Sequence, residues 1–114
     1  MAFLSQLLED HNEYRQSKQL SHFQWDPFLE TLAEKQIQEI IVTKKVQHGN
    51  LPSKGLQNIV SGKRNLFKKN VALQLWLGDQ GHAKPVQEIS FQKLGCSFHE
   101  DSNKNVTIVC NYSP

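Results

Sequence analysis

Apolar side chains recur every three to four residues at the start of the chain, the spacing at which they share one face of an α-helix. This stripe predicts a helix from about Phe3 to Ser17. His11 lies within the stripe, and a histidine on an apolar helical face is most often a hydrogen-bonded packing residue. We therefore interpret His11 as part of the core rather than as a catalytic group.

A second helix is predicted to begin at Asp26-Pro27. The aspartate side chain can accept hydrogen bonds from the first free N–H groups of a helix, and the proline ring already has a helical φ angle. The residues that then recur at helical spacing predict its buried face: Leu29, Leu32, Ala33, Gln36, Ile37 and Ile40. This register leaves Glu30, Glu34 and Lys35 facing solvent.

The middle of the chain changes from helical to strand-like patterning. The helical period fails between Val42 and Ser53, which indicates a loop that has His48 at the edge of its Gly-Asn-Leu-Pro turn. Leu56 to Ser61 is a short apolar segment between two glycines, as expected of a buried strand. A third helix is predicted from Val71 to Trp76, ending at Gly78 in a left-handed cap.

Two strand-like segments, Leu94 to Phe98 and Val106 to Cys110, flank a polar run near the end of the chain. Folding the chain back at Asn103 sets Cys96 opposite Cys110, and opposed strand positions bring Cβ atoms close enough for a disulfide. A hairpin closed by a Cys96–Cys110 bridge is therefore predicted. Both cysteines then have a structural use, which argues against cysteine catalysis.

Length and charge restrict the class of protein. A chain of 114 residues is long enough for one modest core, so a single domain over residues 1–114 is expected. The net charge is only +2, yet no Asp or Glu occurs between Glu39 and Asp79, where lysine and arginine gather. No apolar stretch is long enough to span a membrane. The sequence contains no Gly-x-Ser-x-Gly elbow, phosphate-binding glycine loop or paired-cysteine metal motif.

Several short motifs follow one another along nearly the whole chain. They are His11-Asn12-Glu13-Tyr14-Arg15, Trp25-Asp26, His48, Gln57-Asn58-Ile59, Gly81-His82, Leu94-Gly95-Cys96 and Cys110-Asn111-Tyr112-Ser113-Pro114. In this order they resemble the CAP superfamily, which includes cysteine-rich secretory proteins, venom antigen 5 and plant pathogenesis-related proteins. Together with the predicted elements, the resemblance implies an α+β fold, an α-β-α sandwich in which helices cover both faces of a small antiparallel sheet of about three strands.

The resemblance also implies a cleft in which two histidines and two acidic residues can hold a divalent metal. Here the histidines are His48 and His82, but Gln57 occupies the first acidic position and the shorter Asp79 the second. An amide supplies no negative charge, so we expect an ion such as Zn²⁺ or Mg²⁺ to bind weakly and no cofactor to be required. On the residues alone, a surface or capping role suits both histidines better.

A basic segment surrounds an apolar pair in the acid-free middle of the chain. Its residues are Lys63, Arg64, Leu66, Phe67, Lys68 and Lys69. Such a segment can lie on an anionic membrane surface or bind a glycosaminoglycan, with Phe67 entering the apolar boundary. The alternative is a solvated face whose charge is offset by the acidic first and second helices. Nucleic acid is a poorer partner, because the aromatic residues are not interleaved with the basic ones.

Weaker signals favour an extracellular location. Asn105-Val106-Thr107 is a glycosylation sequon, and Asn111-Tyr112-Ser113 is a second one, weakened by the proline that follows it. With the resemblance, these sequons indicate a secreted glycoprotein. The segment from Met1 to Gln6 lacks the basic region and apolar core of a signal peptide, so a secreted protein would be seen here in mature or recombinant form.

Two hypotheses about function follow. The first is a secreted, non-catalytic binding module, similar to CAP proteins that hold a sterol, a fatty acid or another lipid, or that engage a protein partner. The alternative is a metal-assisted hydrolase in which His48 and His82 hold the ion and Asp79 acts as base. Gln57 argues against the hydrolase, since the site then lacks one carboxylate, and we therefore favour a protein that is not an enzyme.

Overall fold

The computed structural model describes residues 2–49, 51 and 54–114, so Asn50, Pro52 and Ser53 of the expected loop lie outside the described residues. Along the chain the elements are α1 (Ala2–Ser17), β1 (Gln24–Trp25), α2 (Pro27–Thr43), β2 (Leu56–Lys63), a 3-10 turn (Arg64–Leu66), α3 (Val71–Leu77), α4 (Gln80–Gln87), β3 (Lys93–Glu100) and β4 (Asn105–Ser113). The helices and strands expected from the sequence are all present. β1 and α4 were not predicted.

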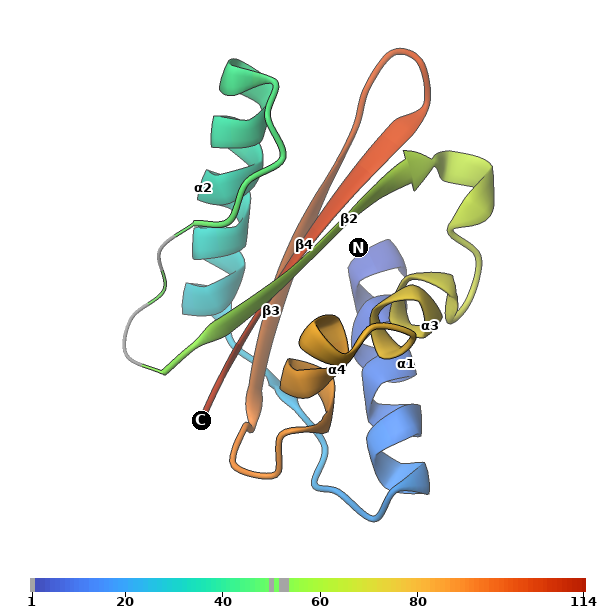
Figure 1. Ribbon diagram of the computed structural model, residues 1–114, viewed down its shortest axis with the longest axis vertical. Helices are drawn as coiled ribbons and strands as arrows, with labels where there is room; N and C mark the ends of the chain where they lie inside the picture. Colours follow the sequence, from blue (N-terminus) through green and yellow to red (C-terminus); the bar gives the residue numbers. More distant parts are fainter. Residues whose placement is uncertain (1, 50, 52–53) are drawn as a thin grey trace.

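The described strands form one sheet in the order β1-β3-β4-β2. β3 and β4 make the predicted antiparallel hairpin, β2 pairs antiparallel with β4, and β1 adds two residues parallel to β3. α2 covers one face of the sheet, and α1, α3 and α4 cover the other (Figure 1). The fold is therefore the expected α-β-α sandwich, with a short fourth strand. None of the helices in the described part of the chain is long and apolar enough to cross a membrane.

Side chains of β4 point alternately to the two faces of the sheet and contribute to an apolar cluster on each face. On the face covered by three helices, β4 contributes Val106, Ile108, Cys110 and Tyr112 to the larger apolar cluster, which also contains Trp76. On the other face Val109 packs with a smaller cluster from α2, formed by Ala33, Ile37 and Ile40. Both faces of the central strand are thus buried, as expected of a sheet with helices on both sides.

The start of α2 follows the sequence prediction. Asp26 Oδ1 accepts hydrogen bonds from the backbone N–H groups of Phe28 (2.8 Å) and Leu29 (3.3 Å). The buried residues of the helix are Leu29, Ala33, Gln36, Ile37 and Ile40. Glu30 requires a correction, because it is half-buried and accepts a hydrogen bond from the indole N–H of Trp25 (2.8 Å). β1 places that indole beside the first turn of α2, which no local pattern could indicate.

α2 approaches the sheet most closely at Gly95 of β3. A Cβ atom added at this position would lie 2.3 Å from the backbone nitrogen of Glu30 and 2.7 Å from the carbonyl oxygen of Asp26. Both distances are far below van der Waals contact, and both atoms belong to the backbone. The glycine therefore allows the first turn of α2 to lie directly on β3.

The end of α3 differs from the prediction. Gly78 has φ −76° and ψ −7°, so the predicted left-handed cap is wrong. Its N–H donates to the carbonyl of Gln74 (3.1 Å), and Asp79 N–H donates to that of Trp76 (3.3 Å), which tightens the last turn without reversing the chain. α4 begins directly afterwards, with Asp79 as its N-cap.

The predicted disulfide is present. Cys96 and Cys110 are opposed in the register of β3 and β4, and their Cα atoms are 4.1 Å apart. The hairpin turn is closed by Asp101, whose Oδ1 accepts hydrogen bonds from the N–H groups of Asn103 (2.8 Å) and Asn105 (2.9 Å). The bond from the Asn105 backbone contributes most to holding the pKa of Asp101 below its usual value.

Reducing this disulfide is expected to lower the free energy of unfolding by about 3 kcal/mol, because the bridge closes a loop in the unfolded chain and restricts its entropy. Thermal melting with and without reductant measures the effect. The Cys96→Ala/Cys110→Ala variant is the control, since its melting should match that of the reduced protein and ignore reductant. Alkylatable thiols in native protein from an oxidising host would contradict the prediction.

Candidate functional site

His48 and Gln57 form one polar pair beside β2. His48 Nδ1 donates to Gln57 Oε1 (3.0 Å), which also accepts from the N–H of Gly49 (3.0 Å). Gln57 Nε2 donates to Asn111 Oδ1 (2.7 Å). Asn111 Nδ2 then donates to the Leu29 carbonyl near the start of α2 (3.0 Å). The amide of Gln57 thus serves as both acceptor and donor, which an ionised carboxylate at this position could not do.

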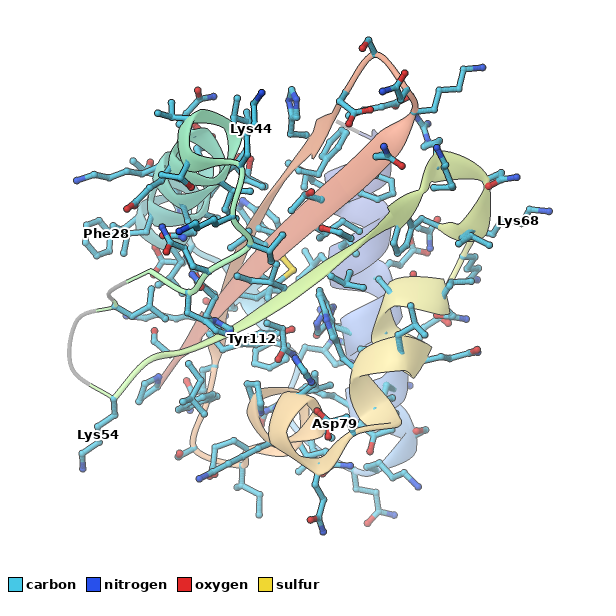
Figure 2. The ribbon with its side chains drawn as sticks, turned by 45° about the horizontal axis from the view of Figure 1, so that its top comes forward. Phe28, Lys44, Lys54, Lys68, Asp79 and Tyr112 are labelled. Atoms are coloured by element: carbon cyan, nitrogen blue, oxygen red, sulfur yellow. A yellow bond between two sulfur atoms is a disulfide. The ribbon has the colours of Figure 1, made fainter. Side chains whose placement is uncertain are left out.

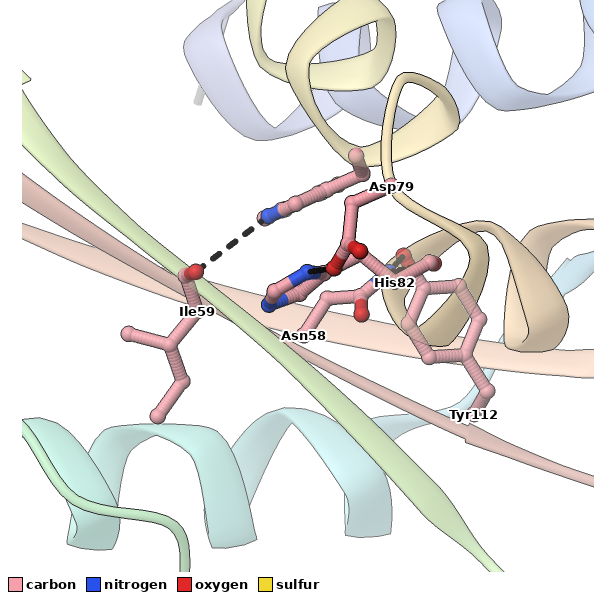
Figure 3. A network of polar contacts seen from close by, with 6 residues as sticks. Asn58, Ile59, Asp79, His82 and Tyr112 are labelled. Carbon is pink, nitrogen blue, oxygen red and sulfur yellow. Dashed lines mark hydrogen bonds and ion pairs between the residues drawn. The ribbon is translucent and has the colours of Figure 1, made fainter.

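Asp79 and His82 form a second pair at the N-terminus of α4 (Figure 3). The carboxylate of Asp79 contacts Nδ1 of His82 three residues along. The backbone carbonyl of His82 accepts a hydrogen bond from Asn58 Nδ2 (2.8 Å), which ties α4 to β2. The side chains of Asp79 and His82 are 61% and 40% exposed, so solvent screens the attraction between them.

The two pairs are attached to opposite faces of the sheet. Gln57 and Asn58 are consecutive in β2, so their side chains point to opposite faces. Through Gln57 and Asn111, His48 is joined to the α2 side, whereas Asn58 binds the carbonyl of His82 on the α4 side. Within the described residues, no three His, Cys, Asp or Glu side chains are grouped to hold a metal ion. As arranged, this donor set does not fit a divalent metal.

A buried chain of hydrogen bonds lies behind the second pair and connects β2, β4 and α1. Asn58 Nδ2 donates to the Tyr112 hydroxyl (3.2 Å), which donates to His11 Nε2 (2.7 Å). Burial keeps the His11 imidazole neutral at neutral pH, so Nδ1 carries the proton that it donates to the Leu7 carbonyl (2.7 Å) and Nε2 is the acceptor. Burial is the main cause that lowers the pKa of His11 from 6.5 to about 4 and raises that of Tyr112. The prediction of His11 as a hydrogen-bonded core residue is confirmed, but no sequence pattern indicated its partners.

Trp76 covers the outer edge of β2. Its side chain is 2% exposed, and its indole N–H donates to the Ile59 carbonyl (3.3 Å), the bond drawn to Ile59 in Figure 3. Trp76 is therefore a core residue. Trp25 is only half-buried, at the opposite edge of the sheet.

The basic segment folds so that its apolar pair is divided. Phe67 is 9% exposed and belongs to the core, whereas Leu66 is 58% exposed. The expectation that Phe67 would enter an apolar boundary is therefore wrong. The 3-10 turn at Arg64–Leu66 directs the Phe67 ring inward, where it lies against Gly62 and leaves 3.3 Å to a Cβ built there. Leu66 takes the exposed position instead.

Basic side chains gather where β2 meets the β3–β4 turn. A hollow there is lined by Lys63, Arg64, Asn65, Asn103 and Lys104. Arg64 pairs with Glu100, and Lys69 lies 3.5 Å from Glu13. The Lys68 side chain projects away from the protein (Figure 2). We call Lys63, Arg64, Lys68 and Lys104 the basic surface; Lys69, which was predicted with them, is paired with α1.

The two sequons differ in accessibility. Asn111 is 0% exposed and its amide is used in the hydrogen bonds described above, so the second sequon is closed in the folded chain. Asn105 is half-buried at the start of β4, where its Nδ2 donates to Asp101 Oδ2 (3.3 Å). Glycosylation at Asn105 stays a prediction.

Comparison with protein families gives one match. The model described as CAP, the cysteine-rich secretory protein family, matches residues 8–112. This range contains both polar pairs, the disulfide and most of the buried hydrogen-bond chain. No curated protein matches the sequence.

Solved structures support the same fold at low identity. An outer surface protein from Borrelia burgdorferi is 17% identical with a TM-score of 0.85, over 97% of this chain and 91% of that one. An extracellular protein containing an SCP domain from Bacillus anthracis is 17% identical with a TM-score of 0.77, over 97% and 40%. NaASP2, solved with Zn²⁺, is 19% identical with a TM-score of 0.73, over 96% and 78%. At these identities the likeness shows the fold alone.

Proposed function

Because the chain belongs to the cysteine-rich secretory protein (CAP) family, we propose that it is a non-catalytic binding module that works outside the cell and docks on anionic lipid surfaces. Proteins with this domain are generally secreted or extracellular, and the neighbours named above include an outer-surface and an extracellular protein. Of the ligand classes that the family resemblance implied, the proposal takes lipid over a separate protein partner. Sterol and fatty acid are the lipids to be tested once docking is measured.

The basic surface is the observation that carries this proposal. Lys63, Lys68 and Lys104 are exposed, and none of them forms an ion pair among the described residues. Each lysine near an anionic membrane contributes about 1 kcal/mol of attraction. Leu66, which is 58% exposed beside them, is available to enter the apolar boundary. Glu100 offsets the charge of Arg64, and Asp101 partly offsets that of Lys63, so the attraction comes mainly from Lys68 and Lys104 with a smaller share from Lys63.

The alternative of a metal-assisted hydrolase is less well supported. It needs His48 and His82 on one ion, whereas each imidazole is engaged with a different partner, Gln57 and Asp79 respectively. The Gln57 amide contributes no negative charge to a cation. We therefore propose that any divalent ion is held weakly and that the module works without a cofactor.

The test is binding to vesicles with and without phosphatidylserine at low ionic strength. We expect binding to rise with phosphatidylserine content and to weaken as salt is added. Changing Lys63, Lys68 and Lys104 together to Gln should reduce that binding by about tenfold or more. Leu66→Ser, made alone, should also reduce vesicle binding. The reduction should be similar at every phosphatidylserine content, because the apolar contact does not depend on charge.

A matched control removes the same charge elsewhere. Lys35, Lys44 and Lys45 are exposed in and after α2, and changing all three to Gln should leave most of the vesicle binding intact. Equal losses in the two triple variants would mean that net charge alone matters and that no docking surface exists. Binding to heparin without binding to vesicles would also contradict the proposal, since the partner would then be a glycosaminoglycan.

A further inference from the structure

A second candidate site lies at the edge of the sheet opposite β2. β1 forms this edge, and its Trp25 shares a hollow with residues of α1 and is hydrogen-bonded to Glu30 in the first turn of α2. A hollow of about 280 Å³ is present here, lined by Leu4, Ser5, Leu8, Trp25 and Glu30. None of these residues takes part in the polar pairs or the basic surface.

The lining combines one aromatic ring, one carboxylate, one serine and an apolar wall formed by two leucines. Trp25 Nε1 donates to Glu30 Oε1 (2.8 Å), which fixes the indole beside the carboxylate. The ring is half-buried, so it is partly desolvated yet still open to a ligand. Leu4 and Leu8 are one helical turn apart in α1 and form the apolar wall.

The charge at this hollow is negative. Neither lysine nor arginine lines it, and in the described part of the chain Glu30 has no ion pair with a basic side chain. Of the residues that the structure describes, Glu30 is therefore the one charged side chain that lines the hollow, and its carboxylate attracts a cation.

We propose that this hollow binds a quaternary ammonium group of the choline type. An indole and a carboxylate both attract a cation, and a partly desolvated indole is the best aromatic partner. A primary ammonium would lose hydrogen bonds to water on the side of Leu4 and Leu8, which offer no side-chain acceptor, and Glu30 Oε1 already accepts from Trp25. A methylated ammonium has no N–H groups to leave unpaired, and its methyl groups suit the leucine wall.

The experiment is a titration followed by the two indole N–H resonances in ¹⁵N-correlated NMR spectra. Choline chloride should shift the Trp25 resonance saturably with a dissociation constant of about 1 mM. Trp76 is 2% exposed at the other edge of the sheet, so its resonance is an internal control that should not move. The neutral isostere 3,3-dimethylbutan-1-ol should produce no comparable shift, because it has the same shape without the charge.

Paired variants separate charge from fold. Glu30→Gln keeps an oxygen acceptor for the Trp25 indole but removes the charge, and it should weaken choline binding roughly tenfold. Glu34→Gln removes the same charge from an exposed position that does not line the hollow, and it should leave the affinity within about twofold. Thermal melting of both variants checks that the fold is retained.

Several outcomes would overturn the proposal. They are equal binding of the neutral isostere, equal binding by Glu30→Gln, stronger binding of N-acetyl-lysinamide than of choline, or no saturable Trp25 shift below about 50 mM choline. Phosphatidylcholine vesicles distinguish the source of the group. If the protein binds these vesicles and Glu30→Gln abolishes that binding, the ligand is a lipid headgroup. If the protein binds choline but does not bind the vesicles, the ligand is a soluble quaternary ammonium compound.

Discussion

Replacing Arg15 with methionine is expected to lower the free energy of unfolding by about 4 kcal/mol or more. Arg15 is 0% exposed, and its guanidinium carbon lies 4.1 Å from the centroid of the Phe23 ring. Its N–H groups donate to four backbone carbonyls, those of Ser21 (2.6 Å), Val86 (3.0 Å), Glu88 (3.0 Å) and Phe91 (2.8 Å). The guanidinium thus joins the end of α1 to the segment that leads from α4 into β3.

Methionine fills a similar volume but donates no hydrogen bond, so buried carbonyl groups lose their partners. An unsatisfied buried acceptor costs about 1 to 3 kcal/mol, and several are affected together. Burial lowers the pKa of Arg15, and Glu88 opposes that change, yet arginine stays charged at neutral pH. Carbonyl dipoles therefore hold this charge, and only a planar group with several N–H donors can reach all of them.

Urea unfolding of wild type and variants measures the loss. Arg15→Lys should recover only part of it, because one ammonium cannot reach both ends of the site. Lys18→Met changes an exposed residue just after the same helix and should alter stability by less than about 0.5 kcal/mol. A loss below about 1 kcal/mol in Arg15→Met would mean that water enters the site and replaces the guanidinium.

The elements that could be predicted are those whose signals come from residues close together in the sequence. The two residues Asp26 and Pro27 are enough to predict where α2 begins. The equal spacing of Cys96 and Cys110 from a polar turn is enough to predict the register of the hairpin. α4 was missed because Gly81 and Pro85 read as helix breakers, although the structure has both within the helix. β1 was missed because two residues have no period of their own, and their pairing with β3 depends on the whole fold.

The site was predictable only in part, for the same physical reason. The family resemblance named His48, Gln57, Asp79 and His82, but spacing along the chain cannot say that consecutive positions of β2 direct their bonds to opposite faces. The exposure of Phe67 was misjudged because a single 3-10 turn decides which of two adjacent apolar residues faces inward. Long-range bonds, such as that between His11 and Tyr112, leave no signal in a single sequence.

Acid is expected to destabilise this protein through His11. The imidazole is 0% exposed, and burial lowers its pKa from 6.5 to about 4, with a smaller contribution from the charge of Arg15. The unfolded chain therefore binds a proton between these two pH values that the folded chain excludes. The stability associated with neutral His11 is present above pH 6.5 and is lost as the pH falls toward 4. The loss is on the order of 3 to 4 kcal/mol.

The measurement is urea unfolding at a series of pH values from neutral to acidic, on wild type and two variants. His11→Gln removes the titrating group, so it should be less stable at neutral pH but should lose less of its stability on acidification. His22→Gln is the matched control, because His22 is exposed and bonded only to Gln16 among the described side chains. Protonation of His11 would place a second N–H against the Tyr112 hydroxyl, which now donates to it, and would put a positive charge near Arg15. If the His11→Gln and wild-type stabilities fall in parallel with pH, protonation of other groups causes the acid sensitivity and the buried imidazole is not its source.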